Sequence, residues 1–127
     1  MKRILPILIS FLFLLAGCSG TETDRSYEQI TQEKAKEMMD TQDVIVLDVR
    51  EQDEYDSGHI PGAVLLPVGT IDEDTAGKVI PEKDSTVLVY CRSGNRSKAA
   101  SDTLVKLGYT KVYEFGGINT WPYDIEQ

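Results

Sequence analysis

Cys91 stands at a position where a thiol could react. It directly follows residues 86–90, an apolar run rich in β-branched side chains, which is typical of a strand buried on both faces in a parallel sheet. Ligands of open α/β sheets bind at the carboxyl ends of the strands. The sequence therefore predicts that Cys91 lies where a catalytic side chain would be, at the start of a loop leading into a helix.

The segment after Cys91 is polar and consists of Arg92, Ser93, Gly94, Asn95, Arg96 and Ser97. Gly94 and Asn95 tolerate positive φ, so the loop can curl until several N–H groups point at the sulfur. The amino end of the following helix adds about half a positive charge. Such a setting lowers the pKa of a thiol from about 8.5 toward or below neutrality, so we expect a nucleophilic thiolate. A buried, inert cysteine would not be followed by so polar a segment.

Residues 91–97 resemble the active-site loop of the single-domain rhodaneses. Three further segments match motifs of that family in the family's order: residues 47–50 with Glu54 and Tyr55, residues 58–63, and residues 116–121. The resemblance extends over residues 27–121. It implies a rhodanese-like α/β fold, with a five-stranded parallel sheet flanked by helices on both faces, and it implies no cofactor.

The same resemblance implies a sulfurtransferase. Cys91 would take a sulfane sulfur from thiosulfate, a polysulfide or a persulfide, hold it as a persulfide, and pass it to cyanide or a thiol. The amides of residues 92–97 would stabilise the negative charge. Arg92 and Arg96 would attract a small anionic donor, although both are equally compatible with surface charges and Arg96 with bracing the loop.

Three features of the loop define the alternatives. A cysteine-dependent phosphatase or an arsenate reductase is one alternative, but the phosphatases place an arginine six residues after the cysteine, where this chain has Ser97. A cradle that is one residue shorter suits a sulfur atom better than a phosphate or an arsenate.

Thiosulfate–cyanide rhodaneses carry a basic residue at the position of Ser93, so thiosulfate is in doubt as the physiological donor. A non-catalytic rhodanese module that docks a partner or passively carries sulfur is the remaining alternative, although such modules usually lack the cysteine.

Other polar residues near the predicted site are interpreted as structural. Asp48 ends a predicted strand and could hydrogen-bond the loop, and Arg50 is expected to pair with a nearby carboxylate. His59 is the only histidine and has no cysteine or aspartate at ligand spacing, which argues against a metal site.

Hydrophobic periodicity predicts alternating strands and helices. The expected elements are a helix over 30–40 capped by Thr31, a strand over 44–47, a helical stretch over 51–57, a strand over 63–67, a strand over 86–90, a helix over 97–107 that stops at Gly108, and a strand over 111–115. This order is typical of βαβ units and hence of an α/β sheet covered on both sides. With 127 residues, the chain fits one such domain and a short appendage.

The amino-terminal segment predicts export. Lys2 and Arg3 precede an apolar stretch over 4–16, which has the length of a secretory signal and is too short to span a bilayer. Residues 14–18 resemble the bacterial lipobox, whose cysteine is diacylated. We therefore expect a signal peptide over 1–17, lipidation at Cys18 with a tether over 18–26, and the rhodanese-like domain over 27–127, held on the extracytoplasmic face of a membrane.

The charge fits this expectation. The net charge is −8, and without Lys2 and Arg3 the 13 basic residues fall to 11 against 21 acidic ones, or −10. A chain of that sign is a poor partner for nucleic acid and is repelled by anionic lipids, so a lipid rather than a basic patch must hold it on a membrane. With Cys18 lipidated, Cys91 has no intramolecular disulfide partner. The sequence names no protein partner.

Overall fold

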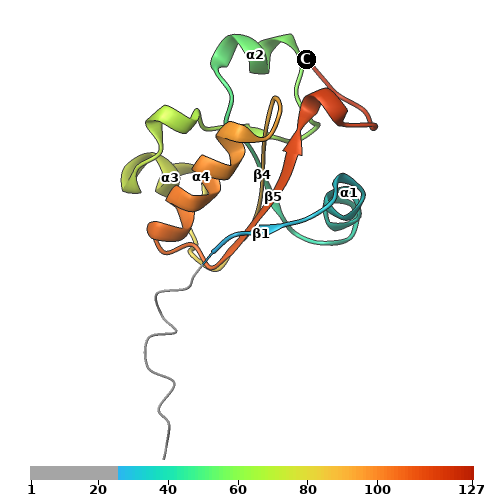
Figure 1. Ribbon diagram of the computed structural model, residues 1–127. Helices are drawn as coiled ribbons and strands as arrows, with labels where there is room; N and C mark the ends of the chain where they lie inside the picture. Colours follow the sequence, from blue (N-terminus) through green and yellow to red (C-terminus); the bar gives the residue numbers. More distant parts are fainter. Residues whose placement is uncertain (1–25) are drawn as a thin grey trace, which may run out of the picture.

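A parallel sheet with strand order β1-β5-β4-β2-β3 forms the centre of the molecule (Figure 1). The computed structural model describes residues 26–127, and every neighbouring pair of strands in it is parallel. The strands are β1 (Glu28–Gln29), β2 (Ile45–Asp48), β3 (Val64–Leu65), β4 (Thr86–Cys91) and β5 (Lys111–Gly117). The helices are α1 (Gln32–Thr41), α2 (Gln52–Ser57), α3 (Glu73–Val79) and α4 (Asn95–Lys106), with 3₁₀ turns at Val68–Thr70 and Ile118–Thr120. The predicted five-stranded rhodanese fold is confirmed.

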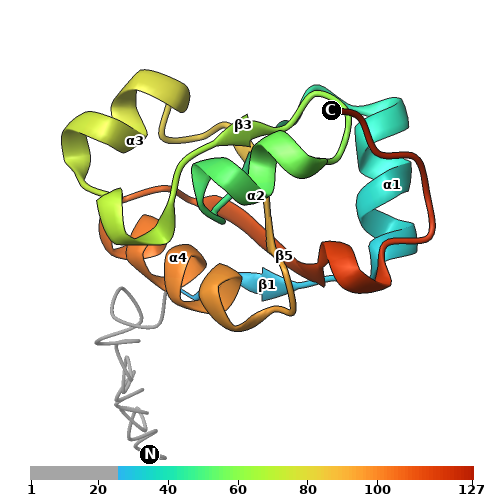
Figure 2. The ribbon, with the colours of Figure 1, turned by 90° about the horizontal axis from the view of Figure 1, so that it is seen from above.

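The central strand β4 shows how the two faces of the sheet are covered. Val87 and Val89 pack in a cluster with α3 and α4, whereas Leu88 and Tyr90 pack in a second cluster with α1. Figure 2 shows α3 and α4 on one side of the sheet and α1 on the other, and Figure 1 shows α2 above the carboxyl ends of the strands. Because side chains alternate along a strand, Cys91 shares the face of Val87 and Val89 and points toward α4.

The predicted elements agree with the structure to within a few residues, with one informative exception. The helix expected over 97–107 begins two residues earlier, because Gly94 adopts a left-handed conformation with φ +108° and turns the chain directly into α4. Thr31 caps α1 as expected, its side chain accepting a hydrogen bond from the Lys34 N–H at 3.0 Å. The sequence analysis missed β1 and α3. Strand β1 has only two residues, too few to show a hydrophobic period, and the residues of α3 are largely polar.

The end of β2 is fixed by a buried ion pair. The Asp48 carboxylate is fully buried and accepts hydrogen bonds from Arg50 Nη2 at 2.7 Å and from the Tyr90 hydroxyl at 2.6 Å. Burial and the hydrogen bond to Asp48 raise the pKa of Tyr90, so its hydroxyl stays a donor. That oxygen also accepts from the Ile60 N–H at 3.1 Å. These contacts tie β2, β4 and the turn before β3 together beside Cys91.

The amino-terminal predictions concern a different part of the chain. Residues 1–25, which include the predicted signal peptide, Cys18 and nearly all of the tether, lie outside the described residues. Within residues 26–127, the model contains no helix with the length and apolar character needed to cross a bilayer.

Replacing Tyr90 tests the buried network. Tyr90→Phe leaves the buried Ile60 N–H without its acceptor and removes one donor from Asp48, so we expect the free energy of unfolding to fall by about 1–3 kcal/mol. Urea unfolding measures this change. The matched control Tyr123→Phe alters a surface tyrosine that is 37% exposed and should unfold like the wild type. Equal midpoints for Tyr90→Phe and wild type would contradict the role of the network.

Candidate active site

Cys91 is the last residue of β4 and lies at the carboxyl end of the sheet. Its side chain is only 1% exposed and packs in the cluster with α4. The register between β4 and β5 shifts between Val89 and Cys91, so that Cys91 pairs with Gly117. This irregularity ends the ladder and lets the chain after Cys91 curl back over the sulfur.

The loop directs hydrogen-bond donors at the sulfur. The Gly94 N–H donates to Cys91 Sγ at 3.0 Å, and the Ser97 Oγ lies 3.4 Å from it. Burial acts to raise the pKa of the Cys91 thiol, but the Ser97 hydroxyl and the N–H groups of Ser97, Gly94 and Ser93 together outweigh it and lower the pKa below its ordinary value. The site can therefore hold a negatively charged sulfur in a buried position.

Two glycines allow the loop to take this path. Gly94 has φ +108°, a conformation that other residues rarely adopt, and it caps α4. Gly117 lies against the loop from β5, where an added Cβ would overlap the Arg92 carbonyl and the Ser93 nitrogen. The Arg92 carbonyl also accepts a hydrogen bond from the Asn119 N–H at 3.1 Å. Asn95, which the sequence analysis also expected to favour positive φ, instead starts α4, and every residue with positive φ in the described part of the chain is a glycine.

The two arginines of the loop differ in their surroundings. Arg96 forms two short hydrogen bonds with Glu54 of α2, at 2.6 and 2.9 Å. The Arg96 guanidinium lowers the pKa of Glu54 to about 2, so the pair stays charged above that pH. Arg92 is exposed and lines a hollow of about 290 Å³ with Arg50, Glu54 and Asn119. Arg96 therefore braces the loop against α2, and Arg92 is the loop cation placed at an opening.

Asp48 and Arg50 lie beside the site rather than in the loop. The hydrogen-bond partners of the Asp48 carboxylate are Arg50 and Tyr90, and none of the described hydrogen bonds joins it to residues 92–97. Arg50 also donates to the Gly58 carbonyl at 2.7 Å, which fixes the end of α2. His59 is buried and stacks on Tyr55 with ring centroids 3.7 Å apart.

Glu114 is a residue that the sequence analysis missed. It lies on β5, is only 2% exposed, and its Oε1 is 2.9 Å from Ser97 Oγ. Its Oε1 also accepts a hydrogen bond from the Gly116 N–H at 2.7 Å. The available signal was a glutamate inside a largely apolar strand, two residues before the glycine pair Gly116 and Gly117. Through Ser97, this carboxyl group is connected to the Cys91 sulfur.

The comparisons with known proteins agree with this geometry. The family model described as "Rhodanese-like domain" matches residues 31–122. The chain belongs to the rhodanese family. It is 35% identical over 96 residues to "Thiosulfate sulfurtransferase GlpE" of Coxiella burnetii, covering 75% of this chain and 87% of that protein.

A second curated relative and a solved structure extend the comparison. "Thiosulfate sulfurtransferase PspE" of Escherichia coli is 38% identical over 72 residues, covering 57% of this chain and 68% of that protein. The solved structure titled "rhodanese with anions from E. coli" superposes with a TM-score of 0.62 at 29% identity, covering 67% of this chain and 99% of that chain. Together, these relatives support a rhodanese-type sulfurtransferase.

Replacing Gly117 tests how the loop is positioned. In Gly117→Ala, the new methyl group would displace the backbone of Arg92 and Ser93, so the N–H groups would leave the sulfur and the pKa of Cys91 would rise. At a pH below the wild-type midpoint, a rise of one unit lowers the thiolate fraction about tenfold, and the rate of Cys91 alkylation by iodoacetamide measured there should fall accordingly.

The matched control for this substitution is Gly77→Ala. Gly77 lies in α3 with nothing within 4 Å of an added Cβ, so alanine should leave Cys91 reactivity unchanged and stabilise the helix by about 0.5–1 kcal/mol. Wild-type alkylation rates in Gly117→Ala would show that the contact between β5 and the loop does not hold the thiolate site.

Proposed function

We propose that this protein is a sulfurtransferase that carries a sulfane sulfur as a persulfide on Cys91. The donor is thiosulfate, a polysulfide or a persulfide, and the acceptor is cyanide or a thiol. The observation that carries the proposal is the loop itself, whose N–H groups and Ser97 hydroxyl lower the pKa of a buried cysteine. A structural cysteine in an apolar core needs no such donors.

The transfer proceeds by two displacements on sulfur. The Cys91 thiolate attacks the outer sulfur of the donor, the bond between that sulfur and the rest of the donor breaks, and the remainder leaves with the electron pair, as sulfite from thiosulfate. The new persulfide carries its negative charge on the outer sulfur, where the loop N–H groups stabilise it. An acceptor thiolate or cyanide then attacks that outer sulfur, and the electron pair returns to Cys91.

The charges around the opening bear on the choice of donor. Arg96 is engaged by Glu54 and Arg50 by Asp48, so neither cation is free for an anionic substrate. Arg92 takes part in none of the ion pairs found within residues 26–127 and lines the hollow beside the loop. We therefore assign Arg92 to attract the donor and Arg96 to hold the loop. One guanidinium compensates a singly charged persulfide better than the two charges of thiosulfate.

Intact mass spectrometry tests the persulfide. The chain from residue 19 onward, incubated with thiosulfate, polysulfide or glutathione persulfide, should gain about 32 Da per sulfur and lose it to cyanide with release of thiocyanate. Cys91→Ser should gain nothing. A wild-type chain that forms no adduct with any donor, although its Cys91 is shown to be reduced, would exclude sulfur transfer and favour a docking module.

We further propose that the protein is an exported lipoprotein anchored through Cys18. The support is the sequence alone: two basic residues, an apolar stretch over 4–16 and the order Leu15, Ala16, Gly17, Cys18. Each buried CH₂ contributes about 0.8 kcal/mol, so two or three acyl chains hold a protein where one does not. The acidic domain would then work at the membrane surface without binding it directly.

Labelling with palmitate tests the anchor. When the full chain is expressed in a bacterial host, we expect the wild type and Cys91→Ser to incorporate labelled palmitate, and Cys18→Ser to incorporate none. The readout is palmitate incorporation rather than membrane binding, because an uncleaved apolar segment would also bind the membrane. Equal labelling of Cys18→Ser and wild type would exclude Cys18 as the lipid attachment site.

A further inference from the structure

The Ser97 hydroxyl is surrounded by more acceptors than it can serve. Its oxygen lies 3.4 Å from Cys91 Sγ, 2.9 Å from Glu114 Oε1, 3.0 Å from the Gly94 carbonyl and 3.4 Å from the Gly116 carbonyl. A hydroxyl carries one proton and donates to one of these acceptors at a time. When Cys91 is ionised, its sulfur and the Glu114 carboxylate therefore compete for the same proton.

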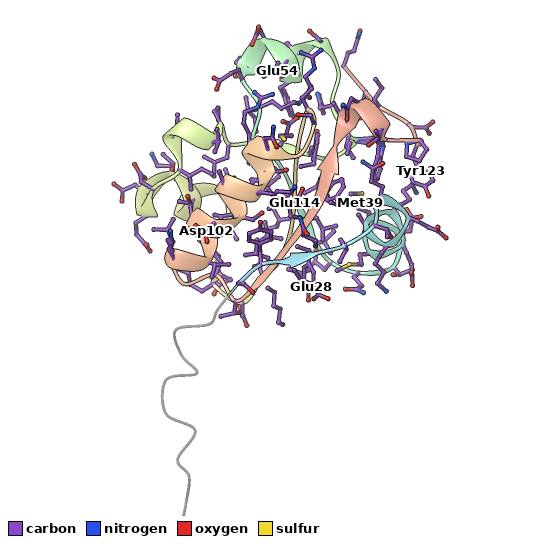
Figure 3. All side chains as sticks on the ribbon, in the orientation of Figure 1. Glu28, Met39, Glu54, Asp102, Glu114 and Tyr123 are labelled. Atoms are coloured by element: carbon purple, nitrogen blue, oxygen red, sulfur yellow. The ribbon has the colours of Figure 1, made fainter. Side chains whose placement is uncertain are left out.

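Glu114 is held in this position independently of Ser97. Its side chain is buried, Oε1 accepts from the Gly116 N–H at 2.7 Å, and Oε2 accepts from Gln29 Nε2 of β1 at 3.3 Å. Figure 3 shows Glu114 in the interior between α4 and β5, with Glu28 on the neighbouring strand β1. A buried carboxylate without such donors would cost several kcal/mol, so these hydrogen bonds are what allows Glu114 to lie beside Ser97 in the interior.

The two groups at the ends of this hydrogen-bond chain have like charges once Cys91 has ionised. The Cys91 thiolate and the Glu114 carboxylate then both lie within hydrogen-bond distance of the same buried hydroxyl. Like charges placed close together in the interior disfavour ionisation of the thiol. The carboxylate also draws the Ser97 hydroxyl, which would otherwise donate to the sulfur.

We propose that Glu114 is a positioning residue that competes with the Cys91 thiolate for the Ser97 hydroxyl and thereby limits the pH range over which Cys91 is a nucleophile. The inference rests on the proposed role of Cys91 as a thiolate. The Glu114 carboxylate draws the Ser97 hydroxyl away from the sulfur and repels the thiolate, so it opposes ionisation of Cys91.

Other polar and charged groups lie near Cys91 and Glu114. Gln29 of β1 and Lys98 of α4 line a hollow of about 370 Å³ that reaches Glu114. On the other side of the pair, Arg96 is close enough for the charge of Cys91 to raise its pKa, after the larger effect of Glu54. Lys98 and Arg96 remain in place in the variants below.

The test measures the ionisation of Cys91 in the full chain, from the rate of iodoacetamide alkylation on the peptide that contains it. In Glu114→Gln, the midpoint should fall by about one pH unit, which corresponds to about tenfold faster alkylation below the wild-type midpoint. The matched control Glu28→Gln removes an exposed charge from the adjacent strand and should leave the midpoint unchanged. An unchanged or raised midpoint in Glu114→Gln would overturn the proposal.

The link through Ser97 is tested by repeating the substitution in a Ser97→Ala background. Without the hydroxyl, Glu114→Gln should shift the midpoint by less than it does in the wild type, since only the direct repulsion remains. An equal shift in both backgrounds would show that Glu114 acts through space alone and would overturn the competition for the Ser97 hydroxyl.

A measurement on the wild type covers the case in which a variant does not fold. Carbon NMR of the labelled glutamate carboxyls should show the Glu114 signal responding as Cys91 ionises, because the Ser97 hydroxyl then turns toward the sulfur, and no such response in Cys91→Ser. A Glu114 signal that does not respond to the ionisation of Cys91 would overturn the coupling. Because alkylation and NMR both read protonation rather than sulfur transfer, this inference can fail while the persulfide experiment succeeds, and the reverse.

Discussion

The hydrogen bonds from the loop after β4 to the Cys91 sulfur are the interaction on which the rest of the site depends. A sulfur that is 1% exposed would stay a neutral thiol if burial acted alone. The loop reverses this outcome by replacing water with fixed N–H groups and a hydroxyl. Those donors cost nothing to reorganise when charge develops on the sulfur, which is the condition for a carrier that alternates between thiolate and persulfide.

The surrounding fold keeps those donors in place. The Asp48, Arg50 and Tyr90 network fixes the ends of β2 and β4, and the ion pair between Arg96 and Glu54 ties α4 to α2. Gly117 lets β5 approach the loop so closely that a methyl group would displace it. Arg50 and Arg96 are therefore engaged in structural ion pairs, and in the proposed sulfur transfer the attraction of an anionic donor falls to Arg92 and the loop amides.

The central elements were predictable because their signals are local. The apolar run of β4, the polar loop and the helix after it located Cys91 correctly. Helix α4 begins earlier than predicted because Gly94 alone makes the turn that the sequence analysis assigned to Gly94 and Asn95 together. The partner of Arg96 could not be read from the sequence, since Glu54 lies 42 residues away. Glu114 was equally invisible, because only the packed sheet shows that its carboxyl is buried against Ser97.

The most direct test of this account is the thiolate absorbance of Cys91 as a function of pH, taken as the difference between the wild type and Cys91→Ser, in the native chain and in urea. The account predicts a native midpoint well below that of the unfolded chain, which should titrate near the ordinary value of about 8.5. A native midpoint at or above the unfolded one would mean that burial dominates over the loop. Cys91 would then be a buried structural thiol, and the proposed sulfur transfer would have no nucleophile.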